Sequence, residues 1–197
     1  LPAEIGQIAG RAGRYQQDGS FGVTHEVPPL DEKLVAAIES HQYDTIDRLC
    51  WRNRALEFGS TGALIASLAA PPPVRVLVRA RDGEDFTALK CLCDDHDVAA
   101  LATNPAAIRL LWEVCQVPDF RKVMRDIHVR LLRRLYLHLA SSAARLPADW
   151  VGKHIAQLDN VSGDIDTLTQ RIAHIRTWTY ISHRADWLDD ASHWQGL

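Results

Sequence analysis

One segment of this sequence, from Asp119 to Ala140, constrains the fold more than any other. Its apolar side chains recur with the 3.6-residue period of an α-helix, and at 100° per residue they fall into two stripes. A helix with two apolar stripes must pack against neighbours on two sides, so the segment predicts a long helix within a bundle, exposed only in its first turns. One stripe contains Phe120, Val123, Met124, Ile127, Leu131 and Leu135, and the other contains Val129, Leu132, Tyr136 and Leu139.

Most of the remaining chain shows the start and stop signals of shorter helices, and the predicted fold class is mainly α. Asp31 is expected to cap a helix over 32–40, and Asn104-Pro105 to open one that runs to Val114. Ser60 or Thr61 can cap a further helix, which the prolines at 71–73 would stop. Other helices are expected after Pro147, after Ser162, and around Ile46, Leu49 and Cys50. Two segments favour extended structure: Phe21 to Val27 predicts a strand, and Val74 to Val78 predicts either a strand or a helical segment.

The composition is that of an ordinary globular domain and excludes several classes of protein. The 197 residues are 47% hydrophobic and 24% charged. No apolar run approaches the roughly 20 residues of a membrane helix, so no membrane contact is expected. The four cysteines form no C-x-x-C pair, which favours a reducing, cytoplasmic location and argues against a metal site. Cys91 and Cys93, with His96 nearby, are better explained as small buried side chains than as zinc ligands. Because the sequence starts at Leu1, we expect it to be part of a longer protein.

The first residues carry the chemically most specific pattern. Gln7-Ile8-Ala9-Gly10-Arg11-Ala12-Gly13-Arg14 has the form Q-x-x-G-R-x-G-R. Arg11 and Arg14 are about one helical turn apart, so their guanidinium groups can reach a shared anion. A guanidinium pairs with phosphate oxygens and can offset the charge that develops as a γ-phosphate is cleaved. The plain alternative is a solvated basic helix end.

This string resembles motif VI of superfamily 2 helicases, the last conserved motif of their second RecA-like domain. The aromatic Tyr15, a polar turn over 16–20 and the strand-like residues 21–24 narrow the resemblance to the mitochondrial degradosome RNA helicase family and its bacterial relatives. Cys115-Gln116-Val117-Pro118 extends it weakly into the helical region. The primosomal replication-restart helicases have an almost identical motif, which leaves DNA as an alternative substrate.

The resemblance implies a function that the chain would share with other parts of the same protein. In that family ATP and Mg bind between two RecA-like domains, and a helical region closes over single-stranded RNA; an exoribonuclease is a further partner that the resemblance suggests. Carried onto this sequence, Arg14 would be the arginine finger, Arg11 a second γ-phosphate contact, and Gln7 and Gly10 supporting positions on the nucleotide side. The sequence has no G-x-x-x-x-G-K-[ST] and no DExH box, so the chain alone is expected to be inactive.

The implied organisation has three regions. Residues 1–27 would be the end of the second RecA-like domain, a short α/β remnant, followed by connecting helices and a small helical subdomain over 28–118, and by a long-helix bundle over 119–197. Two other functions are also compatible with the sequence. One is a non-catalytic helical scaffold or partner-docking module, and the other is a fragment of a DNA replication-restart helicase.

A local basic face suggests where nucleic acid would bind. The net charge of −3 argues against binding through overall charge, but residues 119–134 contain six Lys or Arg against two Asp. Arg121, Lys122 and Arg125 are therefore candidate contacts to an RNA backbone, with a solvated face as the common alternative. Aromatic residues near Arg176 and Arg184 could stack on bases or join helices, namely Trp178, Tyr180, Trp187 and Trp194.

Overall fold

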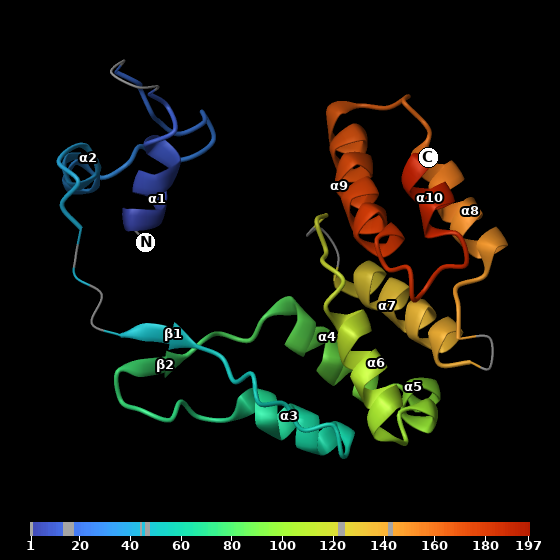
Figure 1. The fold of residues 1–197 in the computed structure, drawn as a ribbon. Helices are drawn as coiled ribbons and strands as arrows, with labels where there is room; N and C mark the ends of the chain where they lie inside the picture. The colour runs from blue at the N-terminus through green and yellow to red at the C-terminus, as the bar shows by residue number, and fades with distance from the viewer. Residues whose placement is uncertain (1, 14–17, 44, 46–47, 122–124, 142–143) are drawn as a thin grey trace. The chain divides into compact units, whose positions relative to one another are not determined.

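The computed structural model describes residues 2–13, 18–43, 45, 48–121, 125–141 and 144–197. Over this part the chain is mainly helical, as predicted from the sequence (Figure 1). The helices are α1 (Pro2–Ala9), α2 (Glu32–Glu39), α3 (Thr61–Ala69), α4 (Glu84–Cys93), α5 (His96–Leu101), α6 (Pro105–Cys115), α7 (Arg125–Leu139), α8 (Ala148–Leu158), α9 (Ile165–Ser182) and α10 (Ala191–Gly196), and the strands are β1 (Leu49–Trp51) and β2 (Leu77–Arg79).

Contacts divide the chain into two compact units, Leu1–Leu49 and Cys50–Leu197. The boundary between these units differs from the boundaries of the three regions expected from the sequence. The three-region organisation therefore stays a prediction. In the first unit α1 packs against α2. Asp31 caps α2 as predicted, because its carboxylate accepts the Lys33 N–H at 2.9 Å.

The strand predicted over Phe21 to Val27 is absent, so that part of the α/β prediction is wrong for the described residues. Residues 18–24 have no regular secondary structure, and a turn follows in which the Val27 N–H donates to Thr24 O at 3.0 Å. A strand needs a hydrogen-bonded neighbour, and the described residues before Leu49 contain none. Val23 and Val27 are exposed as a result.

The second unit has a core that α3 to α7 build together. Helix α4 packs against α3, α5, α6 and α7, and α6 also packs against α7. Ser60 and Asn104 cap α3 and α6 as predicted, through bonds to the Ala63 and Ala107 N–H groups. The most deeply buried side chains of this core come from all five helices, and include Leu64, Leu89, Leu92, Val98, Ile108, Leu111, Leu132, Leu135 and Tyr136.

The strands β1 and β2 form a small two-stranded sheet. The short helix predicted around Leu49 and Cys50 is therefore wrong, because both residues belong to β1. The Ala80 N–H donates to Trp51 O at 2.8 Å beside this sheet. The segment that was ambiguous in the sequence, Val74 to Val78, leads into β2.

Helix α7 is shorter than predicted. It runs from Arg125 to Leu139, whereas the sequence predicted a helix from Asp119 to Ala140. Residue 121 precedes the helix in a bend, where the Arg121 N–H donates to the Asp119 carboxylate at 3.0 Å. Ile127 is 36% exposed and does not belong to the core, while both predicted stripes are buried from Leu131 onward.

The C-terminal elements pack on one another beside α7. Helix α9 packs against α8 and α10, and Figure 1 shows these three helices side by side. The connection between α7 and α8 is tied to the last part of the chain, because the Leu146 N–H donates to Trp187 O at 2.8 Å. Arg145 donates to the backbone oxygens of Ala185 and Leu188.

Candidate functional site

The motif segment ends helix α1. The Gly10 N–H donates to Gly6 O and the Ala12 N–H to Ala9 O, each at 2.9 Å, so the chain stays coiled for one turn beyond Ala9. Gln7, Gly10 and Arg11 are all exposed. Gln7 and Arg11 are four residues apart and share one side of the helix end. Arg14, the predicted finger, lies outside the described residues.

Arg11 is not neutralised by the part of its own chain that the structure describes. Within those residues its guanidinium has neither an ion pair nor a side-chain hydrogen bond, unlike the paired Arg52, Arg133 and Arg184. An exposed guanidinium without a carboxylate partner keeps all its donors available for an external anion. The end of α1 therefore presents a guanidinium that the described part of the chain leaves unpaired.

Gly19 supports this segment, and the sequence pattern gave no reason to select it. A Cβ at Gly19 would overlap the backbone of Ala12 and Gly13. A Cβ at Gly6 would meet only the end of the Tyr43 side chain, which can rotate away. Gly19 is thus the position where close backbone approach at the motif requires glycine. It lies outside the Q-x-x-G-R-x-G-R string, so only the folded chain identifies it.

The predicted nucleic-acid face is described only in part. Lys122 and the side chain of Arg125 lie outside the described residues. Arg121 is half-buried and lines a hollow of about 460 Å³ with Gln170, Arg171 and His174 of α9. Arg171 is engaged by its own chain, because it donates to the backbone oxygens of Asn160 and Ser162.

Burial changes the protonation of His174 at this hollow. Burial is the main cause that lowers the pKa of His174 to about 4, and the nearby Arg121 guanidinium contributes. The ring therefore stays neutral at neutral pH, and its Nε2 accepts a hydrogen bond from Trp178 Nε1 at 3.1 Å. His174 therefore adds no positive charge to the hollow, where the side chain of Arg121 stands beside the acidic Asp166 and the backbone-bound Arg171.

The aromatic side chains near the C-terminus mainly join helices. Trp178 is 4% exposed, and its ring centroid lies 5.6 Å from that of Trp150 on α8 and 5.0 Å from that of His154. Trp187 is 1% exposed beneath the guanidinium of Arg184. Neither of these tryptophans can stack on a nucleobase without opening the packing of the helices.

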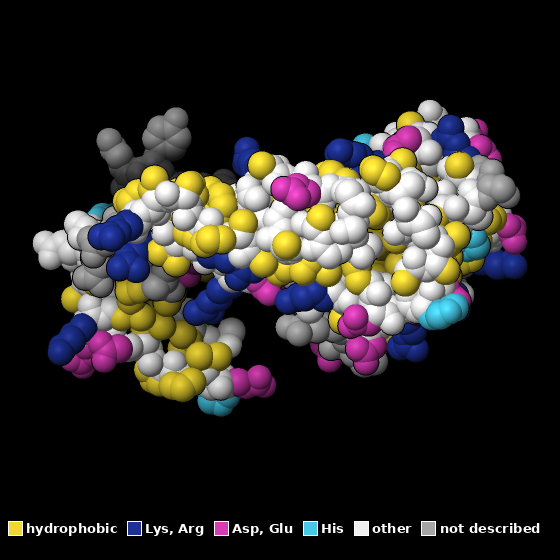
Figure 2. All heavy atoms as spheres, turned by 90° about the horizontal axis from the view of Figure 1, so that it is seen from below, with side chains coloured by type: hydrophobic (Ala, Val, Ile, Leu, Met, Phe, Trp, Pro, Cys, Tyr) yellow, Lys and Arg dark blue, Asp and Glu magenta, His cyan; other side chains and the backbone are white. Residues whose placement is uncertain are grey.

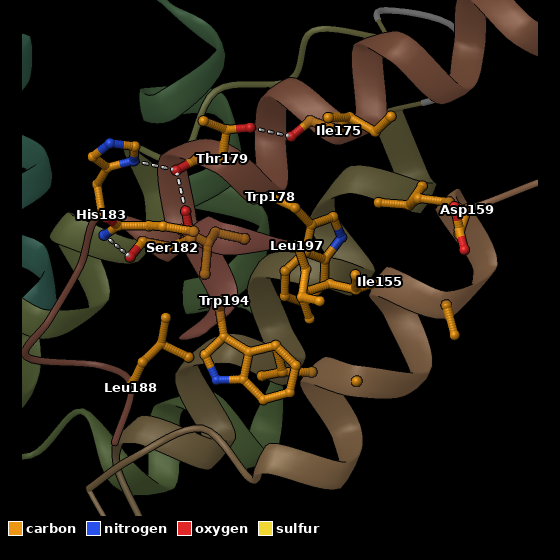
Figure 3. A pocket seen from close by; sticks show the side chains of 16 residues that line it. Ile155, Asp159, Ile175, Trp178, Thr179, Ser182, His183, Leu188, Trp194 and Leu197 are labelled. Carbon is orange, nitrogen blue, oxygen red and sulfur yellow. Dashed lines mark hydrogen bonds between the residues drawn. The ribbon is translucent and has the colours of Figure 1, made fainter. Parts of the chain in front are cut away.

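A mostly apolar cavity lies between α8, α9 and α10. It has a volume of about 460 Å³, and Figure 3 shows Ile155, Trp178 and Trp194 among the side chains that line it. Its hydroxyl and imidazole groups turn back to α9: Thr179 donates to Ile175 O, and Ser182 Oγ and His183 Nδ1 bond to Thr179 O. The cavity therefore has the character of a packing defect more than of a catalytic centre.

Among the described residues no three His, Cys, Asp or Glu side chains converge in a way that could hold a metal ion. No described helix is both long enough and apolar enough to cross a bilayer. On the face seen in Figure 2, Lys and Arg side chains are scattered among acidic and hydrophobic ones. Any contact to a polyanion on this face would therefore depend on a small group of residues.

Comparison with known proteins adds no assignment. No protein-family model matches the chain, and neither the curated proteins nor the solved structures contain a match.

Proposed function

We propose that this chain is part of an ATP-dependent RNA helicase and supplies one side of its nucleotide site. The observation that carries the proposal is the Q-x-x-G-R-x-G-R segment, in which Gln7 and Arg11 are exposed at one helix end and Arg11 is not neutralised by the described part of its chain. The helical unit, Cys50–Leu197, would contact the single-stranded RNA that emerges from the motor domains. The N-terminal RecA-like domains of the same protein are the partner that the site requires.

The residues at the end of α1 fit contact to the outer phosphate of a nucleotide. ATP with Mg would supply the phosphoryl group that is cleaved, and the phosphate-binding loop would come from the partner domain. Arg11 would donate to oxygens of the γ-phosphate, with Arg14 as the finger and with Gln7 and the Gly10 backbone beside it. These groups would stabilise the charge that grows in the transition state, so they would affect turnover more than nucleotide affinity.

Two measurements test this proposal. The isolated chain should hydrolyse no ATP. In the protein that joins the chain to its phosphate-binding domains, Arg11→Ala and Arg14→Ala should each lower kcat, on the order of 10³-fold for a finger, with a much smaller change in nucleotide Kd. Arg75→Ala is the matched control, because Arg75 is exposed and has no ion pair in the described chain.

The results distinguish the rival functions. Normal turnover by both motif variants would show that the segment has a structural role and would favour a non-catalytic helical scaffold. Turnover that depends on the motif, with single-stranded DNA stimulating it more strongly than RNA, would favour a replication-restart helicase. Hydrolysis by the isolated chain that survives Arg11→Ala would contradict the shared-site proposal.

A further inference from the structure

A second basic hollow lies on the helical unit, apart from the residues that the sequence predicted as nucleotide or nucleic-acid contacts. It has a volume of about 450 Å³, within the range of about 300–1,000 Å³ usual for small-ligand sites. Helix α6 contributes Arg109, Trp112 and Glu113, and its C-cap contributes Gln116; these residues lie on one side of the helix because Arg109 is three, four and seven residues before the others. The segment before α3 contributes the opposite wall with Arg54, Ala55, Leu56 and Phe58.

The segment before α3 is held in place by side-chain hydrogen bonds. Asn53 Nδ2 donates to Ser67 O at 2.8 Å and to Ala55 O at 3.1 Å, while its Oδ1 accepts the Ala55 N–H. The Glu57 N–H donates to Ser67 Oγ, which itself donates to Leu64 O. The segment therefore runs along α3 as a fixed strap (Figure 1). Its backbone therefore loses little further entropy when a ligand binds.

The guanidinium of Arg109 lies over an aromatic ring. Its guanidinium carbon lies 4.0 Å from the centroid of Phe58. A cation–π contact of this kind holds the cation over one face of the ring, and within the described residues the N–H groups of Arg109 have no hydrogen bond or ion pair. The residue is exposed, so these groups face the hollow and solvent.

The charge around the hollow is positive. Arg54 and Arg109 have no carboxylate partner within the described chain. The acidic residue of the lining, Glu113, already accepts a hydrogen bond from Arg184 at 2.7 Å. A ligand in the hollow therefore meets two guanidinium groups without a carboxylate partner, while the carboxylate beside them is partly compensated by Arg184, which also pairs with Asp186.

We propose that this hollow, between Arg54 and the Phe58–Arg109 stack, is a binding subsite for the sugar-phosphate backbone and one unpaired base of single-stranded nucleic acid. The two guanidinium groups pair with phosphate oxygens, and the open face of Arg109 stacks on a base. The base must be unpaired, because a paired base has its faces covered by its neighbours in the duplex. The choice of nucleic acid as the ligand rests on the proposed function, whereas the site itself rests on the contacts above.

The test is equilibrium binding of a short fluorescein-labelled oligouridylate to the whole chain, without nucleotide, across a series of KCl concentrations. Arg54→Ala with Arg109→Ala should weaken binding about tenfold or more at fixed salt. It should also lower the magnitude of the salt slope by about 1.4, because each phosphate contact on a single strand contributes about 0.7. Phe58→Leu should weaken binding and leave the slope unchanged, since it removes the aromatic support and no charge.

The matched control is Arg75→Ala with Arg134→Ala, which removes two exposed arginines elsewhere in the same unit. This control should retain most of the affinity. Circular dichroism of each variant checks that the fold is intact.

Several outcomes would overturn the subsite. One is an equal loss of affinity and slope in the control pair, which would show that only total charge matters. Others are the absence of oligouridylate binding by the wild-type chain, or competition by tripolyphosphate or a phosphopeptide as strong as by unlabelled oligouridylate. Because the assay contains no ATP, normal turnover by both Arg11→Ala and Arg14→Ala would remove the proposed function and leave this binding result unaffected.

Discussion

At the scale of single residues, Gly19 decides how closely the chain returns to the motif. The backbone of Ala12 and Gly13 occupies the space where a Cβ would be. The strain of a larger residue at this position cannot be relieved by rotating a side chain, because the obstacle is backbone. The position thus couples a polar loop to the end of α1.

We therefore expect Gly19→Ala to loosen the motif segment. Overpacking of this kind costs about 1–3 kcal/mol, so the amides of Gly10 and Ala12 should exchange with deuterium faster than in the wild type. Gly22→Ala is the control, since nothing lies within 4 Å of a Cβ built there. Equal exchange in both variants would mean that the loop moves aside at no cost.

At the scale of elements, α7, α8 and α9 meet through histidines and tryptophans. The ring of Trp150 lies 5.0 Å from that of His138 on α7 and 4.4 Å from that of His154. His154 Nδ1 also bonds to Trp150 O at 2.8 Å. His128 on α7 is buried and bonds to Val117 O, and its burial lowers its pKa. Of the histidines in this region, burial lowers the pKa of His128 and of His174.

These contacts predict a loss of stability in acid. The pKa of His174 is about 4 in the folded chain against an ordinary value of 6.5. Between these two pH values the unfolded chain binds more protons, so the stabilisation that is complete above pH 6.5 is lost as the pH falls toward 4. The free energy of unfolding in urea should therefore decrease over this window, and less steeply in His174→Gln, whose amide oxygen can still accept the Trp178 N–H.

His96→Gln gives the comparison, because the side chain of His96 is 97% exposed. It should keep the full acid sensitivity of the wild type. If His174→Gln and His96→Gln gave the same pH dependence, His174 would not be the group responsible.

Local signals predicted the helices well and the extended segments poorly. Asp31, Ser60 and Asn104 each cap a helix where the sequence placed the start, since capping depends on residues within one turn. Phe21 to Val27 failed as a strand and Leu49 failed as part of a helix, because strand formation depends on a partner distant in sequence. Ile127 matched the apolar stripe, yet nothing covers it fully.

The residues of the candidate sites show the same difference between local and long-range signals. Gln7, Gly10 and Arg11 could be proposed from the sequence because their pattern is contiguous. Arg54 and Arg109 were not found, since the stack on Phe58 joins segments about fifty residues apart. Nothing in the neighbourhood of either arginine distinguishes it from a solvated surface residue.

At the scale of the whole molecule, the two units differ in how much core they contain. In the first unit Ile38 is the one hydrophobic side chain among the described residues that is fully buried, whereas the second unit has a continuous core. Short chains that bury little apolar surface are marginally stable. The second unit should therefore account for nearly all the cooperative unfolding.

A chain cut to residues 50–197 is expected to unfold in urea in one transition, with a midpoint close to that of the whole chain. Residues 1–49 alone should show weak helical circular dichroism and no cooperative transition. A large drop in the midpoint of the 50–197 chain would instead show that the first unit completes the core of the second.

The backbone hydrogen bond from the Leu146 N–H to Trp187 O also has a consequence for folding during synthesis. The connection between α7 and α8 is completed only by residues 184–188, which also reach back to Glu113 through Arg184. While the chain is being synthesised, the apolar faces of α7 and α8 remain without that cover until this late segment has left the ribosome. The helical unit therefore finishes folding only after most of it has been translated. Products truncated before residue 184 would expose apolar surface and become substrates for chaperones and proteases.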